Sequence, residues 1–477
     1  MSSIRNQQKT ASYFVIGMVM WEFFSYYGMQ ALLILYLTQY LHFPDARAYA
    51  IYGAFTSLIY VTPIIGGWLA DRYCGYRYAT LWGCALIMCG HLMLGLSVHG
   101  LFIGLTLLIL GIGFFKSNAI CLIGDCYPND NAGRSVAFAW YYVSGNLGAV
   151  GSQLLCPYLA QHIGWYAGFI AAAVGMFFGL LMLFCSRRYF KWYKNNVPES
   201  PWKNFHPCKR LGIAASVVAL SFGLIYLILT KLLVGDLLLL VTGIGLLMYL
   251  SIYKTATPAQ KKSLRTIAVL TVFACGFWIF DQQGSSSISL FISRYINRTV
   301  NGFTIPAGSF QAINPGIILV FGAFMAWVWR YLDRKGFRPS PSSKVSVALL
   351  FLIVGFFLIA EAASIAGHQQ LAPMIYPVSG LMIIGAAEMF VDPILLATIT
   401  AAAPAHSEGR LVALYYLATG AIANFVAGKV ADLTIDPTQN TATAFTYHEA
   451  YLQILYVSCF MLAALLFLKC VSRWHRR

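Results

Sequence analysis

The sequence predicts an all-α polytopic membrane protein. Of the 477 residues, 59% are hydrophobic and only 10% are charged, whereas charged residues make up roughly a quarter of a soluble domain. Apolar runs of about 20 residues recur along the chain, and this length lets a helix cross the hydrocarbon core of a bilayer. The composition therefore argues against a soluble enzyme, a nucleic-acid-binding protein and a secreted disulfide-rich domain.

Clusters of Pro, Gly, Asn and charged residues divide the chain into fourteen predicted membrane-spanning helices. The first, over about residues 13–40, is too long for the core of a signal peptide and contains Glu22, so we expect it to be retained. The predicted helices are centred near residues 27, 59, 88, 110, 147, 174, 221, 244, 278, 318, 353, 388, 419 and 458. An even number of crossings places both termini on one side of the membrane.

The distribution of basic residues predicts the orientation. Of the 32 Lys and Arg residues, 26 lie in loops on the side of the termini, five lie in loops on the other side, and Lys116 lies within a predicted helix. Positively charged loops are retained in the cytoplasm. We therefore expect both termini to be cytoplasmic, and we attribute the net charge of +16 to topology rather than to an acidic partner such as nucleic acid.

Two related loops indicate an internal repeat. Residues 71–77 read D-R-Y-C-G-Y-R and residues 333–338 read D-R-K-G-F-R, and each loop follows the second helix of a six-helix block. We predict an N-terminal six-helix bundle over residues 1–186, a basic linker with two extra helices over 187–262, and a C-terminal six-helix bundle over 263–477. This is the arrangement of the major facilitator fold, in which the substrate site lies between the halves.

Five ionisable residues lie inside predicted helices, where a charge costs at least roughly 2.5–3.5 kcal/mol and needs a partner or a watery cavity. They are Glu22, Lys116, Asp281, Glu388 and Asp392. The spacing of Glu22, Tyr26 and Gln30 places these three on one side of the first helix. A buried carboxyl of this kind can take up and release a proton, although it could also only hold helices together.

The other buried charges have structural alternatives as well. Lys116 could extend its ammonium group to the membrane interface. Glu388 and Asp392 share a helix face, and Pro393 follows, so Asp392 could simply satisfy backbone groups that the proline leaves unpaired. We favour Glu388 as the functional residue.

Further polar and aromatic residues are candidates for lining a cavity. Asp281 begins a polar stripe with Gln282, Ser285, Ser289 and Ser293, which is typical of a cavity-lining helix but also of close packing through small residues. Asn146 and Asn314 could bind an amide or ammonium group, or only join helices. The aromatic candidates are Tyr26, Tyr27, Tyr60, Tyr142, Trp278 and Tyr415, for each of which core packing is the alternative.

No motif in the sequence predicts an enzyme. It contains no H-E-x-x-H, no Walker loop and no G-x-S-x-G. The 11 cysteines are scattered without paired C-x-x-C motifs, so we expect small buried apolar side chains rather than a metal site or disulfides. We expect no cofactor.

Six motifs, in order along the chain, resemble the proton-coupled oligopeptide transporters, a branch of the major facilitator superfamily. They are W-E-F-F-S-Y-Y-G from Trp21, Y-V-T-P-I-I-G-G-W-L-A-D-R from Tyr60, F-F-K-S-N from Phe114, F-x-x-x-Y-x-x-x-N-x-G from Phe138, F-Q-A-I-N-P from Phe310 and A-E-M-F-V-D-P from Ala387. The two extra helices are similar to those of bacterial members.

The resemblance implies a proton-coupled symporter that imports di- and tripeptides across a bacterial inner membrane by alternating access. Lys116 would bind the peptide carboxylate and Glu388 its ammonium group, while Glu22, Lys116 and Glu388 would take part in proton coupling. Asn146 and Asn314 would bind the peptide main chain, and the tyrosines would line the pocket. The expected partners are the peptide, protons and membrane lipid, and we expect a monomer.

The chain departs from the family pattern in the first helix. The family pattern in this helix is E-x-x-E-R-F. In this chain Val19 stands at the first acid of the pattern, Glu22 at the second acid and Phe23 at the arginine. Gln30 stands where the family has a further arginine, and Ser293 stands where the family has the acid that pairs with this arginine. We therefore expect a Gln30–Ser293 hydrogen bond to close the gate with less pH dependence. Tyr415 stands where the family has a tryptophan. These changes resemble the atypical subgroup, and we expect Glu22 alone to carry the proton step of the first helix.

Two other functions stay open. One is transport of a different small zwitterion or anion, because a fold does not determine a substrate. The other, from a different class, is a membrane enzyme or a receptor that does not transport.

Overall fold

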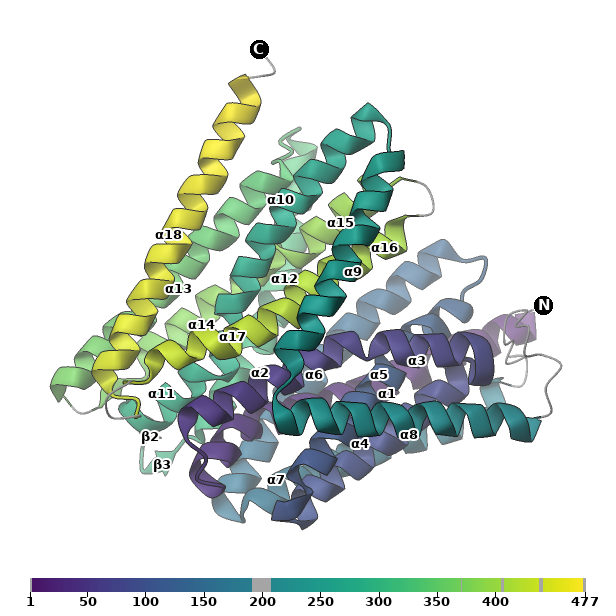
Figure 1. Cartoon of the computed structure of the whole chain (residues 1–477), viewed down its shortest axis with the longest axis horizontal. Helices are drawn as coiled ribbons and strands as arrows, with labels where there is room; N and C mark the ends of the chain where they lie inside the picture. Colours follow the sequence, from purple (N-terminus) through teal and green to yellow (C-terminus); the bar gives the residue numbers. More distant parts are fainter. Residues whose placement is uncertain (1, 191–206, 370, 405–406, 437–440, 475–477) are drawn as a thin grey trace. The chain divides into compact units, whose positions relative to one another are not determined.

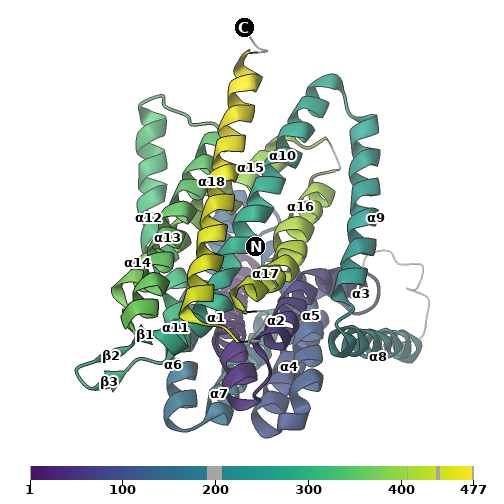
Figure 2. The same ribbon diagram turned by 60° about the vertical axis from the view of Figure 1, so that its left-hand side comes forward.

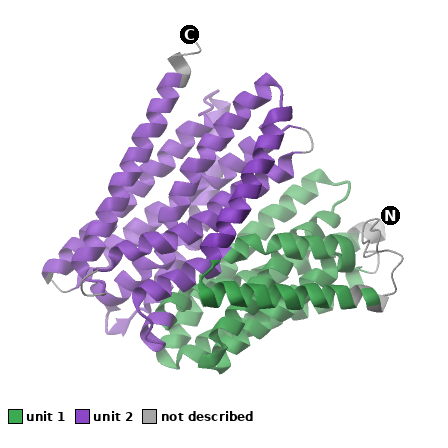
Figure 3. Cartoon of the chain, in the orientation of Figure 1, with its two compact units in different colours: residues 1–36, 58–233 green, residues 37–57, 234–477 purple. Residues whose placement is uncertain are grey.

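The computed structural model describes residues 2–190, 207–369, 371–404, 407–436 and 441–474. These residues are almost entirely helical (Figure 1). They form two compact units: unit 1 comprises residues 1–36 and 58–233, and unit 2 comprises residues 37–57 and 234–477 (Figure 3). The helix α2, Asp45–Val61, is thus divided, and most of it belongs to unit 2.

Unit 1 is a helical bundle. Its helices are α1 (Ser2–Leu35), α3 (Pro63–Leu69), α4 (Gly75–Leu96), α5 (Leu101–Asp125), α6 (Asn131–His162), α7 (Trp165–Cys185) and α8 (Pro207–Lys231). Short π-helical and 3-10 turns occur at Ala70–Cys74, Val98–Gly100 and Ser186–Phe190, and the π-helical turn Tyr36–Tyr40 begins with the last residue of the first segment of unit 1. These turns punctuate the connections and leave the spans intact.

Small residues bring the helices of unit 1 close together, as is usual in membranes. A Cβ atom on Gly148 of α6 would lie 2.1 Å from the carbonyl oxygen of Met20 on α1. On α4, a Cβ atom on Gly83 would lie 2.8 Å from the carbonyl oxygen of Gly111 on α5. The sequence therefore places glycine where α1 meets α6 and where α4 meets α5.

Unit 2 contains the remaining helices, and several of its membrane spans consist of two helices separated by a short turn. Its helices are α9 (Val234–Thr255), α10 (Pro258–Asp281), α11 (Ser287–Tyr295), α12 (Ile313–Arg334), α13 (Pro341–Gln369), α14 (Ile375–Ala387), α15 (Asp392–Ala402), α16 (Glu408–Tyr416), α17 (Ala423–Ala431) and α18 (Ala444–Trp474). The helix α13 lies beside α14 and α18 (Figures 1 and 2).

The strands of unit 2 are short. β1 (Ile296–Asn297) pairs in parallel with β4 (Ala372–Pro373), with Ile296 opposite Ala372. β2 (Thr299–Val300) pairs antiparallel with β3 (Phe303–Thr304), with Thr299 opposite Thr304. β1, β2 and β3 lie in the connection that follows α11 (Figure 2), and β4 lies in the connection that follows α13.

The fourteen predicted crossings are confirmed. Eleven helical stretches of the described chain are long and apolar enough to span a membrane, and one of them, Asp45–Leu96, has 52 residues, enough for two crossings. The helices α1 and α6 supply the others, because they have 34 and 32 residues but a more polar composition. These two helices carry Glu22 and Asn146.

Three spans of unit 2 are interrupted in the middle. The α10–α11 span contains a 3-10 turn at Gln282–Ser285, the α14–α15 span one at Glu388–Phe390, and the α16–α17 span a π-helical turn at Leu417–Ile422. Interruptions of this kind free backbone groups and often occur at functional sites. The polar residues after Asp281 therefore do not lie on one continuous helix, because the turn at Gln282–Ser285 separates α10 from α11, and the cavity-lining role of these residues stays a prediction.

The two extra helices attach to different units. Ile213, Ala214 and Val217 of α8 pack against Leu69 and Phe114 in unit 1. In unit 2, α9 comes close to α16 at Gly245, where a Cβ atom would lie 2.9 Å from the side chain of Leu414.

Candidate functional site

Unit 1 holds a buried acid and a partly buried base near each other. Glu22 of α1 is 2% exposed, and its Oε2 accepts no hydrogen bond from the described residues. Lys116 of α5 is close enough to attract this carboxylate electrostatically, yet no ion pair within 4 Å joins Lys116 to any described residue. The pair is therefore close but not locked together.

Tyrosine rings surround the ammonium group of Lys116. Its Nζ lies 5.1 Å from the ring centre of Tyr60 and 6.0 Å from that of Tyr26. The ring of Tyr27 meets that of Tyr26 edge-on at 5.0 Å. A cation over aromatic faces is stabilised without losing its charge, so Tyr26 and Tyr60 can hold Lys116 ready for an anion.

Asn146 and Tyr142 lie one turn apart on α6. The Nδ2 of Asn146 donates to the carbonyl oxygen of Tyr142 at 2.9 Å, and Asn146 is 7% exposed. Tyr142 is exposed. One donor of Asn146 therefore stabilises its own helix, which leaves its second N–H for another acceptor.

Unit 2 holds a second buried carboxyl group at the interruption between α14 and α15. Glu388 is 9% exposed and accepts a hydrogen bond from Nδ2 of Asn314 on α12. The two helices approach closely here because residue 385 is glycine: a Cβ atom there would lie 3.4 Å from the Cα of Asn314. Asp281 and Asp392 lie near enough to Glu388 to repel its charge.

Trp278 and Tyr415 both contact Asp392. The Nε1 of Trp278 on α10 donates to Oδ1 of Asp392 at 2.8 Å, and the hydroxyl of Tyr415 on α16 donates to the same oxygen at 2.5 Å. The neighbouring Gln282 lies in the 3-10 turn after α10, where the Oγ of Ser285 approaches both of its oxygens at 3.5 Å. The alternative that Asp392 only satisfies backbone groups left unpaired by Pro393 does not account for its contacts, because the hydrogen bonds of its side chain come from Trp278 and Tyr415.

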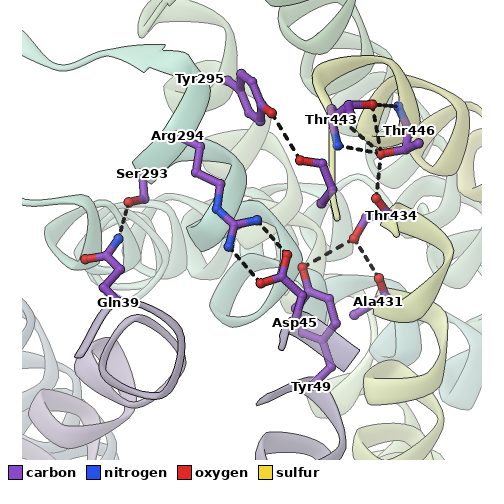
Figure 4. Close-up of polar contacts among 11 residues, drawn as sticks. Gln39, Asp45, Tyr49, Ser293, Arg294, Tyr295, Ala431, Thr434, Thr443 and Thr446 are labelled. Carbon is purple, nitrogen blue, oxygen red and sulfur yellow. Dashed lines mark hydrogen bonds and ion pairs between the residues drawn. The ribbon is translucent and has the colours of Figure 1, made fainter. Parts of the chain in front are cut away.

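A polar cluster in unit 2 joins α2 to α11 (Figure 4). Arg294 donates from Nη1 and Nη2 to the two carboxylate oxygens of Asp45 at 2.6 and 2.7 Å. The hydroxyls of Tyr49 and Thr434 lie 3.3 Å apart. We call Asp45, Tyr49, Arg294 and Thr434 the Asp45 cluster. Sequence reasoning missed it, because the two charged residues are 249 positions apart.

The predicted gate residue Ser293 lies beside the Asp45 cluster. Its hydroxyl accepts a hydrogen bond from Nε2 of Gln39 at 2.5 Å (Figure 4). Gln30 is 7% exposed and belongs to unit 1, so the Gln30–Ser293 bond stays a prediction.

The parts of the chain that the structure describes contain no group of three or more His, Cys, Asp or Glu arranged to hold a metal ion. The cysteines in those parts are free thiols. Outside the spans, burial raises the pKa of the Cys126 thiol to about 12, and Asp125 adds to this effect. Cys126 therefore stays a neutral thiol.

Comparisons with known proteins agree on one family. The family profile PTR2, described as the POT family, matches residues 78–447. The chain is 28% identical over 455 residues to dipeptide and tripeptide permease A of Proteus mirabilis, covering 94% of this chain and 92% of that one. It is 29% identical over 437 residues to peptide transporter YePEPT of Yersinia enterocolitica, covering 86% and 85%.

A solved structure shows the same architecture. The crystal structure of a peptide transporter POT in complex with sulfate is 26% identical, with a TM-score of 0.80, and the match covers 95% of this chain and 94% of that one. The interrupted helices and the buried charges described above thus lie in a major facilitator fold. The family is made up of transporters, and this chain belongs to the POT family.

Proposed function

We propose that this chain imports di- and tripeptides with an inward proton gradient, and that Lys116 and Glu388 bind the two ends of the peptide. The observation that carries the proposal is a base in unit 1 and an acid in unit 2, each inside a span. Neither forms an ion pair with a described residue. A peptide zwitterion supplies the missing partner for each.

The energetics favour this ligand class. An ionisable group at the bilayer centre costs roughly 2.5–3.5 kcal/mol or more. Lys116 offsets part of this cost with the faces of Tyr26 and Tyr60, and Glu388 offsets part with Asn314. A ligand with a carboxylate and an ammonium group offsets more, and its side chains are not needed for this, so the site tolerates many sequences.

Glu22 is the proposed proton carrier of unit 1. Its Oε2 lacks a donor among the described residues, and Lys116 is its nearby cation. A peptide carboxylate that binds Lys116 partly neutralises the charge of this lysine. Lys116 then attracts ionised Glu22 less strongly. Peptide binding therefore favours protonation of Glu22, which couples the two events.

Alternating access completes the proposal. We propose that the bundles of residues 1–186 and 263–477 rock about the site, with residues 187–262 as the link between them, and that Gln30 and Ser293 form part of the gate. The proposed orientation has both termini in the cytoplasm, in the inner membrane of a bacterium, with a single chain as the working unit. Size measurement of the detergent-solubilised protein by light scattering tests the last point.

Transport of another small zwitterion or anion is the second candidate, because Lys116 and its tyrosines would hold any carboxylate. The two are separated in proteoliposomes that contain the purified chain. A labelled dipeptide is offered with and without an inward proton gradient, and competitors include a free amino acid and dipeptides blocked at either end.

The proposal predicts accumulation only with the gradient and competition only by peptides with both ends free. Equal competition by the blocked dipeptides would contradict it, and absence of dipeptide flux would favour the second candidate.

A further inference from the structure

Asp392 joins three elements of unit 2 through one oxygen atom. Its Oδ1 accepts from Nε1 of Trp278 on α10 and from the hydroxyl of Tyr415 on α16, at 2.8 and 2.5 Å. Asp392 itself is the first residue of α15, directly after the interruption at Glu388–Phe390. The side chain therefore connects the start of α15 to two neighbouring helices.

The helix α15 does not need this side chain to begin. Its N-cap residue is Val391, Pro393 follows at a position where its missing N–H is no loss, and Leu395 donates to the carbonyl oxygen of Val391 at 3.0 Å. No side-chain cap is formed. A negative charge at a helix N-terminus is favourable, but this does not require two aromatic donors on one oxygen.

The carboxyl group of Asp392 finds its hydrogen-bond donors in these two aromatic residues. No described basic residue pairs with Asp392, and the neighbouring groups Glu388 and Asp281 are acidic. A hydrogen bond of this length requires its donor group to point at the acceptor oxygen. The indole and the phenol are consequently held in fixed orientations.

The two donors are placed differently. Tyr415 is 1% exposed, so its ring lies in the core of unit 2. Trp278 is only partly buried and packs edge-on against Phe277 at 5.7 Å. Part of the Trp278 ring is therefore open to contact, while its N–H is fixed on the same Asp392 oxygen to which Tyr415 donates.

We propose that Asp392 is a positioning residue that fixes the orientation of Trp278, and through it the preference of the transporter for peptide side chains. This inference rests on the proposed peptide site, but the orientation of Trp278 can be measured without substrate. Asparagine keeps one oxygen acceptor at this position, whereas serine is too short to reach both donors. We therefore expect Asp392→Ser to change the orientation of Trp278 more than Asp392→Asn does.

The orientation is tested by fluorine NMR on protein labelled with 5-fluorotryptophan. The chain contains 11 tryptophans, and the resonance that disappears in Trp278→Phe is that of Trp278. We expect this resonance to shift in Asp392→Ser and to shift less in Asp392→Asn. Asp333→Asn is the matched control, because Asp333 lies at the exposed end of α12, where its side chain pairs with Arg338 at 2.7 Å.

An unchanged Trp278 resonance in Asp392→Ser would overturn the proposal, whether or not the chain transports peptides. If Asp392→Ser does not fold, the comparison of Asp392→Asn with Asp333→Asn decides, since the positioning role requires a shift in the first and none in the second.

The effect on preference is tested by competition among dipeptides that differ only in side chain. We expect Asp392→Ser to change the ratio of KM values between large and small side chains by about tenfold, the contribution of one hydrogen bond to a charged group. We expect the same change in the double variant Trp278→Phe, Tyr415→Phe, and no further change when Asp392→Ser is added to it. A further change in the triple variant would contradict action through these two residues. Absence of dipeptide transport by the native chain would refute the proposed function and leave the NMR result intact.

Discussion

Arg294 and Asp45 form a two-pronged ion pair between α11 and α2, with both guanidinium donors within 2.7 Å of a carboxylate oxygen. The pair joins residues 37–57 to the rest of unit 2, to which they belong although the chain on either side belongs to unit 1. Two further contacts hold the same segment: the hydroxyl of Ser57 donates to the carbonyl oxygen of Ala421 at 2.7 Å, and Gly53 lies against Gly428.

Breaking the Asp45–Arg294 pair is expected to destabilise unit 2. The side chains are 10% and 32% exposed, so Asp45→Asn leaves a partly buried guanidinium without its anion at a cost of about 2 kcal/mol. The melting temperature in detergent measures this. The exchanged variant Asp45→Arg, Arg294→Asp should recover part of the loss, and no recovery would mean that the geometry around the pair matters more than its charges.

Gly148 and Gly151 provide a matched pair of substitutions on α6. A Cβ atom at residue 148 would lie 2.1 Å from the carbonyl oxygen of Met20, whereas at residue 151 the nearest atom is 3.9 Å away. We expect Gly148→Ala to lower thermal stability strongly by separating α1 from α6, at a cost of about 2 kcal/mol or more, and Gly151→Ala to change it little. Equal melting temperatures for the two variants would refute the close approach.

Glu22→Gln is expected to abolish accumulation that is driven by a proton gradient. Glutamine keeps the size and polarity of the side chain but carries no proton across the membrane. Exchange of labelled for unlabelled peptide at equal pH needs no net proton movement, so it should persist in this variant. Undiminished gradient-driven uptake by Glu22→Gln would contradict the assignment of Glu22 as the proton carrier.

Tyr60 is expected to strengthen peptide binding through Lys116. Its ring centre lies 5.1 Å from the ammonium group, and contacts of this kind contribute about 0.5–2 kcal/mol. Tyr60→Leu should therefore raise the KM for dipeptides by roughly 2- to 30-fold, while Tyr60→Phe, which keeps the ring, should raise it less. If both variants behave alike, the hydroxyl and not the ring is the important group.

Much of the fold follows from local properties of the sequence. Apolar runs between turn residues predict all fourteen crossings, and the peripheral pair is found as α8 and α9. The interruption of the α10–α11 span is a local feature too, since Gly284 lies among several serines there, but a helix with polar residues on one face and an interrupted helix have similar compositions. Periodicity alone does not distinguish them.

The site was predictable where a residue type is costly in its surroundings. Glu22, Lys116 and Glu388 stand out because a charge in a span needs a reason. The partners do not stand out: Asp45 lies at the start of α2 where an acid is unremarkable, and its contact with Arg294 depends on the tertiary fold. For Asp392 the sequence offers only its neighbour Pro393 as a structural explanation, because it does not reveal that Trp278 and Tyr415 converge on it.

The central claim is that Lys116 and Glu388 bind opposite ends of the peptide, and end-blocked dipeptides test it most directly. Uptake of a labelled dipeptide is measured in proteoliposomes with an inward proton gradient and competitors carrying either a C-terminal amide or an N-terminal acetyl group. The variants are Lys116→Ala and Glu388→Gln, with Lys231→Ala, at the exposed end of α8, as control.

We predict that the native chain and the control reject both blocked peptides. In residual uptake or in peptide binding, Lys116→Ala should lose its discrimination against the C-terminal amide only, and Glu388→Gln its discrimination against the N-terminal acetyl group only. Unchanged discrimination in both variants would contradict the assignment of the two ends.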